Sequence, residues 1–177
     1  MDMADAVNIM LYASKRKNGE EGFAAWNIFH VDDANKIREF LREKHRDLPP
    51  TFDPIHSQHY FLDSHLRKEL YEAKGVISWR VEQRPGEAVF IPAGCAHQVC
   101  VCFALLLADL PSLYQVSNAA DCIKVAVDFV STENVQRCFK LTQEFREINL
   151  EKAWKDDVLQ LRNMLWFAWL SCQRQLS

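Results

Sequence analysis

The residue whose type and setting point most clearly to chemistry is His97. It follows a turn at Arg84–Glu87, an apolar run at Ala88–Ile91 and a Pro-Ala-Gly corner that begins at Pro92. A turn, a buried strand and a corner in this order place the imidazole at the mouth of a β-structure, where it can reach a ligand such as a metal ion. A histidine that is only hydrogen-bonded within the core fits the same pattern, so the segment alone leaves both interpretations open.

The other histidines and the cysteines give weaker signals. His56 and His59 have a spacing that suits a metal pair. The six cysteines contain no Cys-x-x-Cys pair, which disfavours a zinc ribbon. The chain opens Met-Asp-Met-Ala-Asp, without the basic and apolar regions of a secretory signal, so free thiols in the cytosol or nucleus are expected.

Length, composition and charge limit the classes of protein to consider. A chain of 177 residues, of which 49% are hydrophobic, can bury one core, so a single domain is expected. The net charge of −3 gives no electrostatic reason for direct DNA or RNA binding, whereas a basic partner such as a histone tail is tolerated. The apolar runs Val99–Leu107 and Met164–Cys172 are shorter than the roughly 20 residues that span a bilayer, so no membrane span is expected.

The periodicity of apolar residues predicts short strands and four helices. The strands are expected at Val7–Ala13, Trp26–Val31, Ser78–Gln83, Ala88–Ile91 and Ile123–Val130. The helices are expected from Asp32 to a stop at Leu48, from Asp63 or Ser64 to Gly75, from Ser131 or Thr132 to Ile148, and over Asp156–Trp169. This order favours an α+β fold with a mainly β core, either a β-barrel or a jelly roll with helical additions.

Several segments, in register over most of the chain, carry a family resemblance. The segment Gly86–Val99 reads GEAVFIPAGCAHQV and is similar to the pattern GDxVFIPAGxPHQV. The further matching segments are Asp53–His56 with Tyr60–Asp63, Gly75-Val76 with Trp79, Cys122–Ser131 (CIKVAVDFVS) and Leu141–Arg146 (LTQEFR). Together they resemble the jumonji-C (JmjC) histone demethylases that act on lysine nine of a histone tail.

The resemblance implies an iron(II)- and 2-oxoglutarate-dependent oxygenase of the nucleus. Such an enzyme hydroxylates an N-methyl group of lysine, and the product then loses formaldehyde. A methylated histone tail is the implied substrate, with chromatin or transcription factors as further partners. The implied fold is an incomplete jelly-roll (double-stranded β-helix, cupin-like) barrel. The chain would be a single partial JmjC domain, with first barrel strands at 1–31, a helical insert at 32–75, barrel strands at 76–131 and C-terminal helices at 132–177.

The resemblance also assigns metal ligands. These enzymes hold Fe(II) by two histidines and one carboxylate, and His97 matches one of the histidines. The other two ligands form a His-x-Asp pair shortly before a strand that Asp5–Tyr12 resembles, so the carboxylate falls on Asp2. The paired histidine would precede Met1, which suggests a start at an internal methionine and severely weakened iron binding, and this leaves open whether the fragment is active. The same match places His56 in a scaffold segment rather than at a metal.

A cation is needed for the distal carboxylate of 2-oxoglutarate. The family often supplies a lysine on the strand or loop after the His-x-Asp pair, which indicates Lys17 or, with less support, Lys15. Lys124 is an alternative because it is isolated in an apolar strand, although a lysine there can also extend to solvent. Asn8 and Tyr12 either line the pocket or simply pack within their strand.

One segment departs from the family pattern. An apolar stretch at 100–116 separates His97-Gln98-Val99 from Ser117-Asn118, and its removal restores the pattern. A Gln-Val pair stands before the stretch and another at its end, as a retained intron would leave, and we hypothesise a splicing or gene-model artefact. Two other classes stay open: a non-catalytic JmjC-like module for chromatin contacts, and a small cupin that binds another metal or ligand.

Overall fold

The computed structural model describes residues 2–16, 18–100, 121–148 and 159–176. Its strands are β1 (Asp5–Ala13), β2 (Ala24–Phe29), β3 (Ser78–Gln83), β4 (Ala88–Ile91), β5 (His97–Cys100) and β6 (Cys122–Phe129). Its α-helices are α1 (Ala34–Lys44), α2 (Ser64–Lys74), α3 (Val135–Ile148) and α4 (Leu161–Leu176). Short 3-10 turns at Val31–Asp33 and Thr132–Asn134 lead into α1 and α3.

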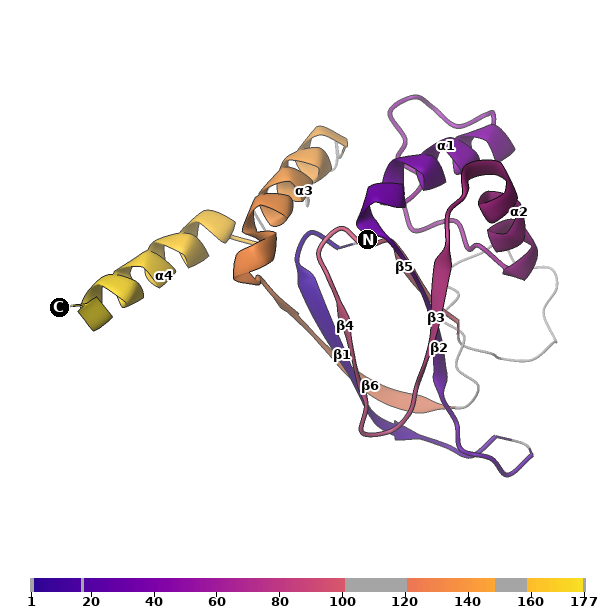
Figure 1. The fold of residues 1–177 in the computed structure, drawn as a ribbon, viewed down its shortest axis with the longest axis horizontal. Coiled ribbons are helices and arrows are strands. Elements are labelled where there is room, and N and C mark those ends of the chain that lie inside the picture. The colour runs from indigo at the N-terminus through magenta and orange to yellow at the C-terminus, as the bar shows by residue number, and fades with distance from the viewer. Residues whose placement is uncertain (1, 17, 101–120, 149–158, 177) are drawn as a thin grey trace.

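The six strands form two sheets of three strands each. The strand orders are β4-β1-β6 and β3-β2-β5, and all neighbouring strands are antiparallel. Figure 1 shows the two sheets facing one another. The predicted α+β class is confirmed. The described strands, however, make two open sheets, and no described strand joins them into a closed barrel.

Apolar side chains from both sheets fill the space between them. Met10 on β1 and Trp26 on β2 are almost completely buried there. The other buried members of this cluster are Ala6, Ala24, Val89, Ile91 and Cys95. Burial of one large apolar side chain contributes about 1.5–3 kcal/mol, so this cluster stabilises the face-to-face packing of the sheets.

One buried amide connects the two sheets by hydrogen bonds. Gln83, at the end of β3, accepts a hydrogen bond from Trp26 Nε1 at 2.9 Å. Its own Nε2 donates to the carbonyl oxygens of Asn8 at 2.7 Å and Glu87 at 3.1 Å. Because a buried amide is costly unless its partners are present, Gln83 fixes how β1 lies relative to β2 and β3.

The helices α1 and α2 lie together beside the β2 sheet, on the side away from β1 (Figure 1). Their contact forms a second apolar cluster, in which Phe29 of β2 packs with Phe40 of α1 and Leu70 of α2. The ends of α2 follow the sequence prediction. Asp63 accepts a hydrogen bond from the Leu66 amide at 2.8 Å, and Gly75 ends the helix with a left-handed φ of 67°.

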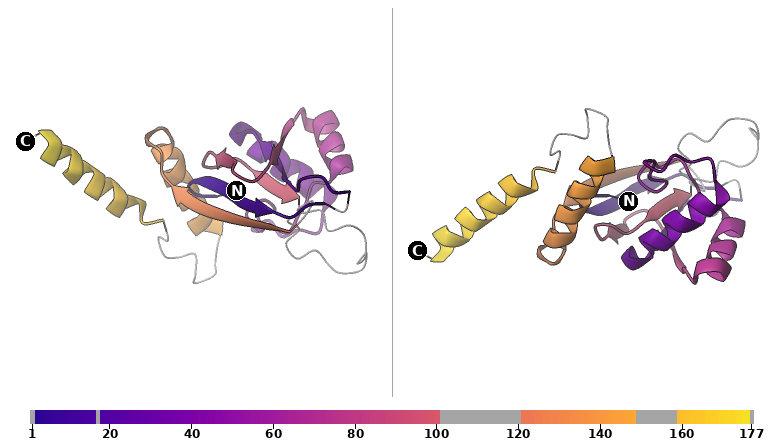
Figure 2. Two further views of the ribbon diagram at one scale, coloured as in Figure 1. Left: turned by 90° about the horizontal axis from the view of Figure 1, so that it is seen from below. Right: turned by 90° about the horizontal axis from the view of Figure 1, so that it is seen from above.

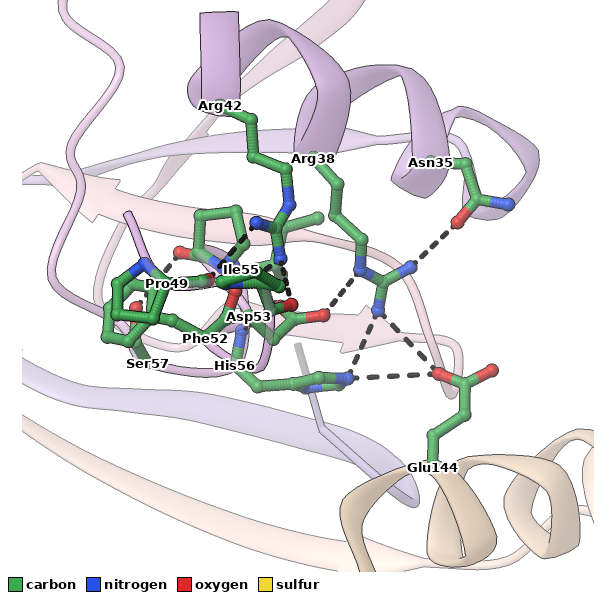
Figure 3. A network of polar contacts seen from close by, with 12 residues as sticks. Asn35, Arg38, Arg42, Pro49, Phe52, Asp53, Ile55, His56, Ser57 and Glu144 are labelled. Carbon is green, nitrogen blue, oxygen red and sulfur yellow. Dashed lines mark hydrogen bonds and ion pairs between the residues drawn. The ribbon is translucent and has the colours of Figure 1, made fainter. Parts of the chain in front are cut away.

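A polar network joins α1, the irregular segment 51–61 and α3 (Figure 3). Arg38 of α1 donates to Asp53 Oδ2 at 2.7 Å and lies 3.1 Å from His56 Nε2. Glu144 of α3 completes the network, with its Oε2 3.6 Å from Arg38 Nη2. Burial lowers the pKa of His56 to about 4, although Asp53 acts in the opposite direction. His56 is therefore a neutral scaffold residue, as the family resemblance implied.

Three features differ from the sequence prediction. The strand β5 was not predicted, and His97 is its first residue. The α-helical part of α3 begins at Val135, after the 3-10 turn. The last helix is Leu161–Leu176 rather than Asp156–Trp169, and Gln160, with a φ of 49°, separates it from the preceding chain. Figure 2 shows α4 extending away from the sheets.

Two further predictions concern the apolar stretch after β5 and the absence of a membrane span. The atypical stretch 100–116 lies outside the described residues except for its first position, so the splicing hypothesis stays a prediction. In the described part of the chain, every helix is too short or too polar to cross a membrane.

Candidate metal centre

Two predicted metal ligands, far apart in sequence, lie next to one another. Asp2 precedes β1, and His97 begins β5 in the opposite sheet. The distance from His97 Nε2 to Asp2 Oδ2 is 3.5 Å. The His97 side chain is 16% exposed and that of Asp2 is 39% exposed, so neither side chain is fully buried in the core.

The orientation of His97 leaves one ring nitrogen for a ligand. Its Nδ1 lies 3.0 Å from the carbonyl oxygen of Cys95, which can only accept a hydrogen bond, so Nδ1 carries the proton. The unprotonated Nε2 then points toward Asp2. A carbonyl that accepts from one ring nitrogen is the usual way in which proteins orient a metal-binding histidine. Burial lowers the pKa of His97, which favours the neutral form that binds metals.

In the Pro-Ala-Gly corner before His97, the backbone at Gly94 packs closely against neighbouring side chains. Gly94 has a φ of 79°, a left-handed conformation that favours glycine, and a Cβ added there would lie 3.2 Å from side-chain atoms of Leu141 and Val31. The Gly94 amide donates to the backbone oxygen of Asp2 at 3.2 Å. The Pro-Ala-Gly corner therefore contacts the segment that carries the other candidate ligand.

A buried carboxylate that sequence reasoning missed lies three residues after Asp2 in the chain. Asp5, only 2% exposed, accepts hydrogen bonds from the amides of Ala93 and Ser131, both at 2.8 Å, and from Asn134 Nδ2 at 2.6 Å. Burial alone would raise the pKa of Asp5, but the hydrogen bonds from Ser131 and Ala93 outweigh it and lower the pKa. Asp5 is thus an ionised carboxylate with three donors around it.

Lys124 lies on the inner face of the β1 sheet. In the antiparallel register it is opposite Met10, which is completely buried, so the two side chains share the face turned toward the β2 sheet. Its Nζ lies 5.5 Å from the centroid of the Trp26 ring. That ring lies 6.2 Å from the His97 ring. Burial lowers the pKa of Lys124.

The other residues predicted to contact 2-oxoglutarate lie in different environments. Asn8 lies opposite Val89 and Ala126, and its buried Oδ1 has no hydrogen-bond partner within the protein. Lys15 and Tyr12 are exposed. Lys17, the first choice for 2-oxoglutarate, lies outside the described residues.

The strand of His97 is attached to the helical insert by one side chain. Gln98 Nε2 donates to the Leu62 carbonyl oxygen at 2.6 Å, and its Oε1 accepts from the Leu62 amide at 2.9 Å. Because alternate residues of a strand face opposite sides, His97 turns toward the β1 sheet while Gln98 turns toward the helices. The pair of bonds fixes β5 at the position from which His97 reaches Asp2.

Comparison with known proteins relates the sequence of this chain to a known family. The family described as "JmjC domain, hydroxylase" matches residues 18–105. The chain is 42% identical over 170 residues to lysine-specific demethylase 3A-A of Xenopus laevis, covering 93% of this chain and 11% of that protein. The chain belongs to the JmjC family. It is also 35% identical over 200 residues to lysine-specific demethylase 3A of Homo sapiens, covering 95% of this chain and 14% of that protein.

A more distant relative extends the match. Lysine-specific demethylase 3 of Drosophila melanogaster is 34% identical over 206 residues, covering 97% of the JmjC chain and 22% of that protein. The JmjC chain therefore spans between 11% and 22% of the length of these three relatives. The family predicted from the sequence motifs is confirmed.

The donor set of this JmjC chain fits the metal that its family implies. An imidazole nitrogen and a carboxylate oxygen that lie 3.5 Å apart are of the types that make up the His-His-carboxylate set of non-haem iron. The buried Asn8 Oδ1 on β1 has no hydrogen-bond partner within the protein, so it is able to accept a hydrogen bond from a ligand. Within the described residues, no group of three or more His, Cys, Asp or Glu side chains is arranged to hold a metal ion.

Proposed function

We propose that this JmjC chain is part of an Fe(II)- and 2-oxoglutarate-dependent histone lysine demethylase of the nucleus. The approach of His97 Nε2 to Asp2 Oδ2, at 3.5 Å, is the observation that carries the proposal. Asp2 precedes β1 and His97 begins β5 of the other sheet, and both side chains are partly exposed. Membership of the JmjC family and the names of the relatives, lysine-specific demethylases, support the choice of reaction.

In this proposal the two sheets are parts of a jelly-roll barrel, and Asp2 and His97 hold the iron between them. The bound iron would supply the activation of oxygen that hydroxylation of an N-methyl group requires. His97 keeps Nε2 free because Nδ1 is engaged by the Cys95 carbonyl oxygen. Asp2 supplies a negative charge that favours a bound cation.

Lys124 is the proposed partner of the distal carboxylate of 2-oxoglutarate. The ammonium lies over Trp26 between the sheets, where a carboxylate would find a cation with reduced competition from water. Asn8 is proposed to line the same pocket, because its buried Oδ1 has no partner within the protein. Lys17 stays a prediction from the sequence.

The proposed substrate is a methylated lysine in a histone tail. A chain with a net charge of −3 attracts a basic peptide more readily than an acidic one. We propose that chromatin proteins or transcription factors are further partners and that the chain makes no sequence-specific contact with DNA.

Turnover on a defined peptide tests the proposal. The chain is incubated with Fe(II), 2-oxoglutarate and a histone H3 peptide dimethylated at lysine nine, and formaldehyde and peptide mass are measured. The expected result is formaldehyde release and loss of methyl groups, both abolished in His97→Ala and both retained in His65→Ala, whose side chain is exposed. Peptide binding without turnover, equal in the wild type and His97→Ala, would instead favour a non-catalytic module.

A further inference from the structure

We propose that Asp5 is the positioning residue of the metal centre and sets the separation between Asp2 and His97. This inference rests on the proposed function, because it concerns the two side chains proposed to hold the metal. Asp5 itself does not reach that position. It acts through the backbone segments that carry Asp2 and His97.

The contacts of Asp5 span three distant parts of the chain. Oδ1 accepts from the Ala93 amide at 2.8 Å and from Asn134 Nδ2 at 2.6 Å, while Oδ2 accepts from the Ser131 amide at 2.8 Å. Asp5 is therefore the point at which the start of β1, the corner before β5 and the end of β6 are joined.

Only short chain segments separate this junction from the candidate ligands, so the junction restricts where Asp2 and His97 can lie. Asp2 lies only three positions before Asp5, and Ala93 lies four positions before His97. A residue advances the chain by at most about 3.6 Å, so short segments leave each ligand little freedom once their ends are joined. The bond from the Gly94 amide to the Asp2 carbonyl oxygen, at 3.2 Å, restricts the first segment further.

The chemistry of the junction requires a carboxylate. All three neighbours are donors, and an ionised carboxylate accepts at both oxygens without donating. The orientation of Asn134 is fixed because its Oδ1 accepts from Arg137 Nη1 at 2.9 Å, which turns Nδ2 toward Asp5. An asparagine in place of Asp5 would keep the shape but would set its NH₂ group against one of these donors.

Metal affinity distinguishes a positioning role from a purely structural one. Co²⁺ is titrated into the full chain and followed by its visible absorption, for the wild type, Asp5→Asn, Ile37→Val and Ile37→Ala. Ile37 is buried in α1 and takes no part in the hydrogen bonds of Asp5, so its two variants lower stability by graded amounts without removing any of those bonds. All titrations are made at a temperature at which circular dichroism shows each variant folded.

The expected result is at least a tenfold loss of Co²⁺ affinity in Asp5→Asn, about the effect of removing a supporting hydrogen-bond partner at a metal site, with a changed absorption spectrum. The Ile37 variants should bind as the wild type does. A milder variant, Asn134→Ala, removes one donor and should lower the affinity about threefold, which provides the test if Asp5→Asn does not fold.

The outcomes separate the inference from the proposed function. If the wild type binds Co²⁺ and both Asp5→Asn and Asn134→Ala bind it equally well, the positioning role is refuted and the metal centre stands. If the wild type binds no Co²⁺, or if His97→Ala binds it as tightly, the metal centre is refuted and the role of Asp5 falls with it.

Discussion

The ammonium of Lys124 lies over the face of Trp26, 5.5 Å from the ring centroid, and brings a cation to the inner side of the β1 sheet. The same indole lies 6.2 Å from the His97 ring, so the cation and the candidate metal ligand flank one aromatic side chain. An interaction between a cation and an aromatic face contributes about 0.5–2 kcal/mol, which offsets part of the cost of partial burial of the lysine. The arrangement is therefore stable before any ligand arrives.

Replacement of Lys124 by methionine should weaken 2-oxoglutarate binding. Methionine keeps the length and packing of the side chain but removes the charge that would pair with the distal carboxylate. Loss of such a charged hydrogen bond corresponds to about a ten- to hundredfold lower affinity. Isothermal titration calorimetry with Mn²⁺ present measures it. Lys140→Met, at an exposed position of α3, is the matched control. Equal 2-oxoglutarate affinities for the two variants would show that Lys124 does not bind the distal carboxylate.

Replacement of Gln98 by alanine should destabilise the attachment of β5 to the helical insert. The buried Leu62 amide loses its acceptor, because Gln98 Oε1 supplies that bond at 2.9 Å. An unpaired buried donor costs about 1–3 kcal/mol in the free energy of unfolding. Urea unfolding measures the change. Gln136→Ala, which is exposed on α3, should stay within about 0.5 kcal/mol of the wild type, and a similar loss in both variants would contradict the account.

Stability should fall as the pH is lowered from about 6.5 to about 4. The folded protein keeps His56 neutral in this window because its pKa is lowered to about 4, whereas an unfolded chain binds the proton near its ordinary value of 6.5. The unfolded state thus binds more protons, so its free energy falls relative to the folded state as the pH decreases. Asp53, whose pKa is also lowered, adds a loss in the same direction at lower pH.

Thermal unfolding at pH 7 and pH 5 checks this dependence. His56→Gln should have a smaller difference between the two pH values than the wild type, because glutamine does not titrate. His65→Gln makes the same change at a side chain that is 78% exposed, and it should keep the wild-type difference. A wild-type difference in His56→Gln would show that another group is responsible.

Local signals predicted the elements whose ends are determined nearby in the chain. The cap at Asp63, the stop at Gly75 and the turn at Arg84–Glu87 each depend on residues within a few positions, and each is present in the structure. The turn has Gly86 at a φ of 86°, as its proline and glycine indicated. His97 and Asp2 were predicted because matching motifs supplied what local signals lacked.

Long-range pairing explains what the sequence did not predict. The strand β5 has only four residues, and its pairing with β2 joins His97 to Ile28 in a way that no local pattern encodes. Asp5 looked like an ordinary polar residue at a strand start, because its donors lie 88 to 129 positions away. The direction of Lys124 likewise depended on the register of β6 with β1, which places it opposite Met10.

The central claim is that Asp2 and His97 together hold a divalent metal ion. Electron paramagnetic resonance of Mn²⁺ tests it most directly, because the signal of the free ion falls when the protein binds it. The account predicts a reduced signal for the wild type, His65→Ala and Asp47→Asn, and the full free-ion signal for His97→Ala and Asp2→Asn. Binding by His97→Ala and Asp2→Asn equal to that of the wild type would contradict it.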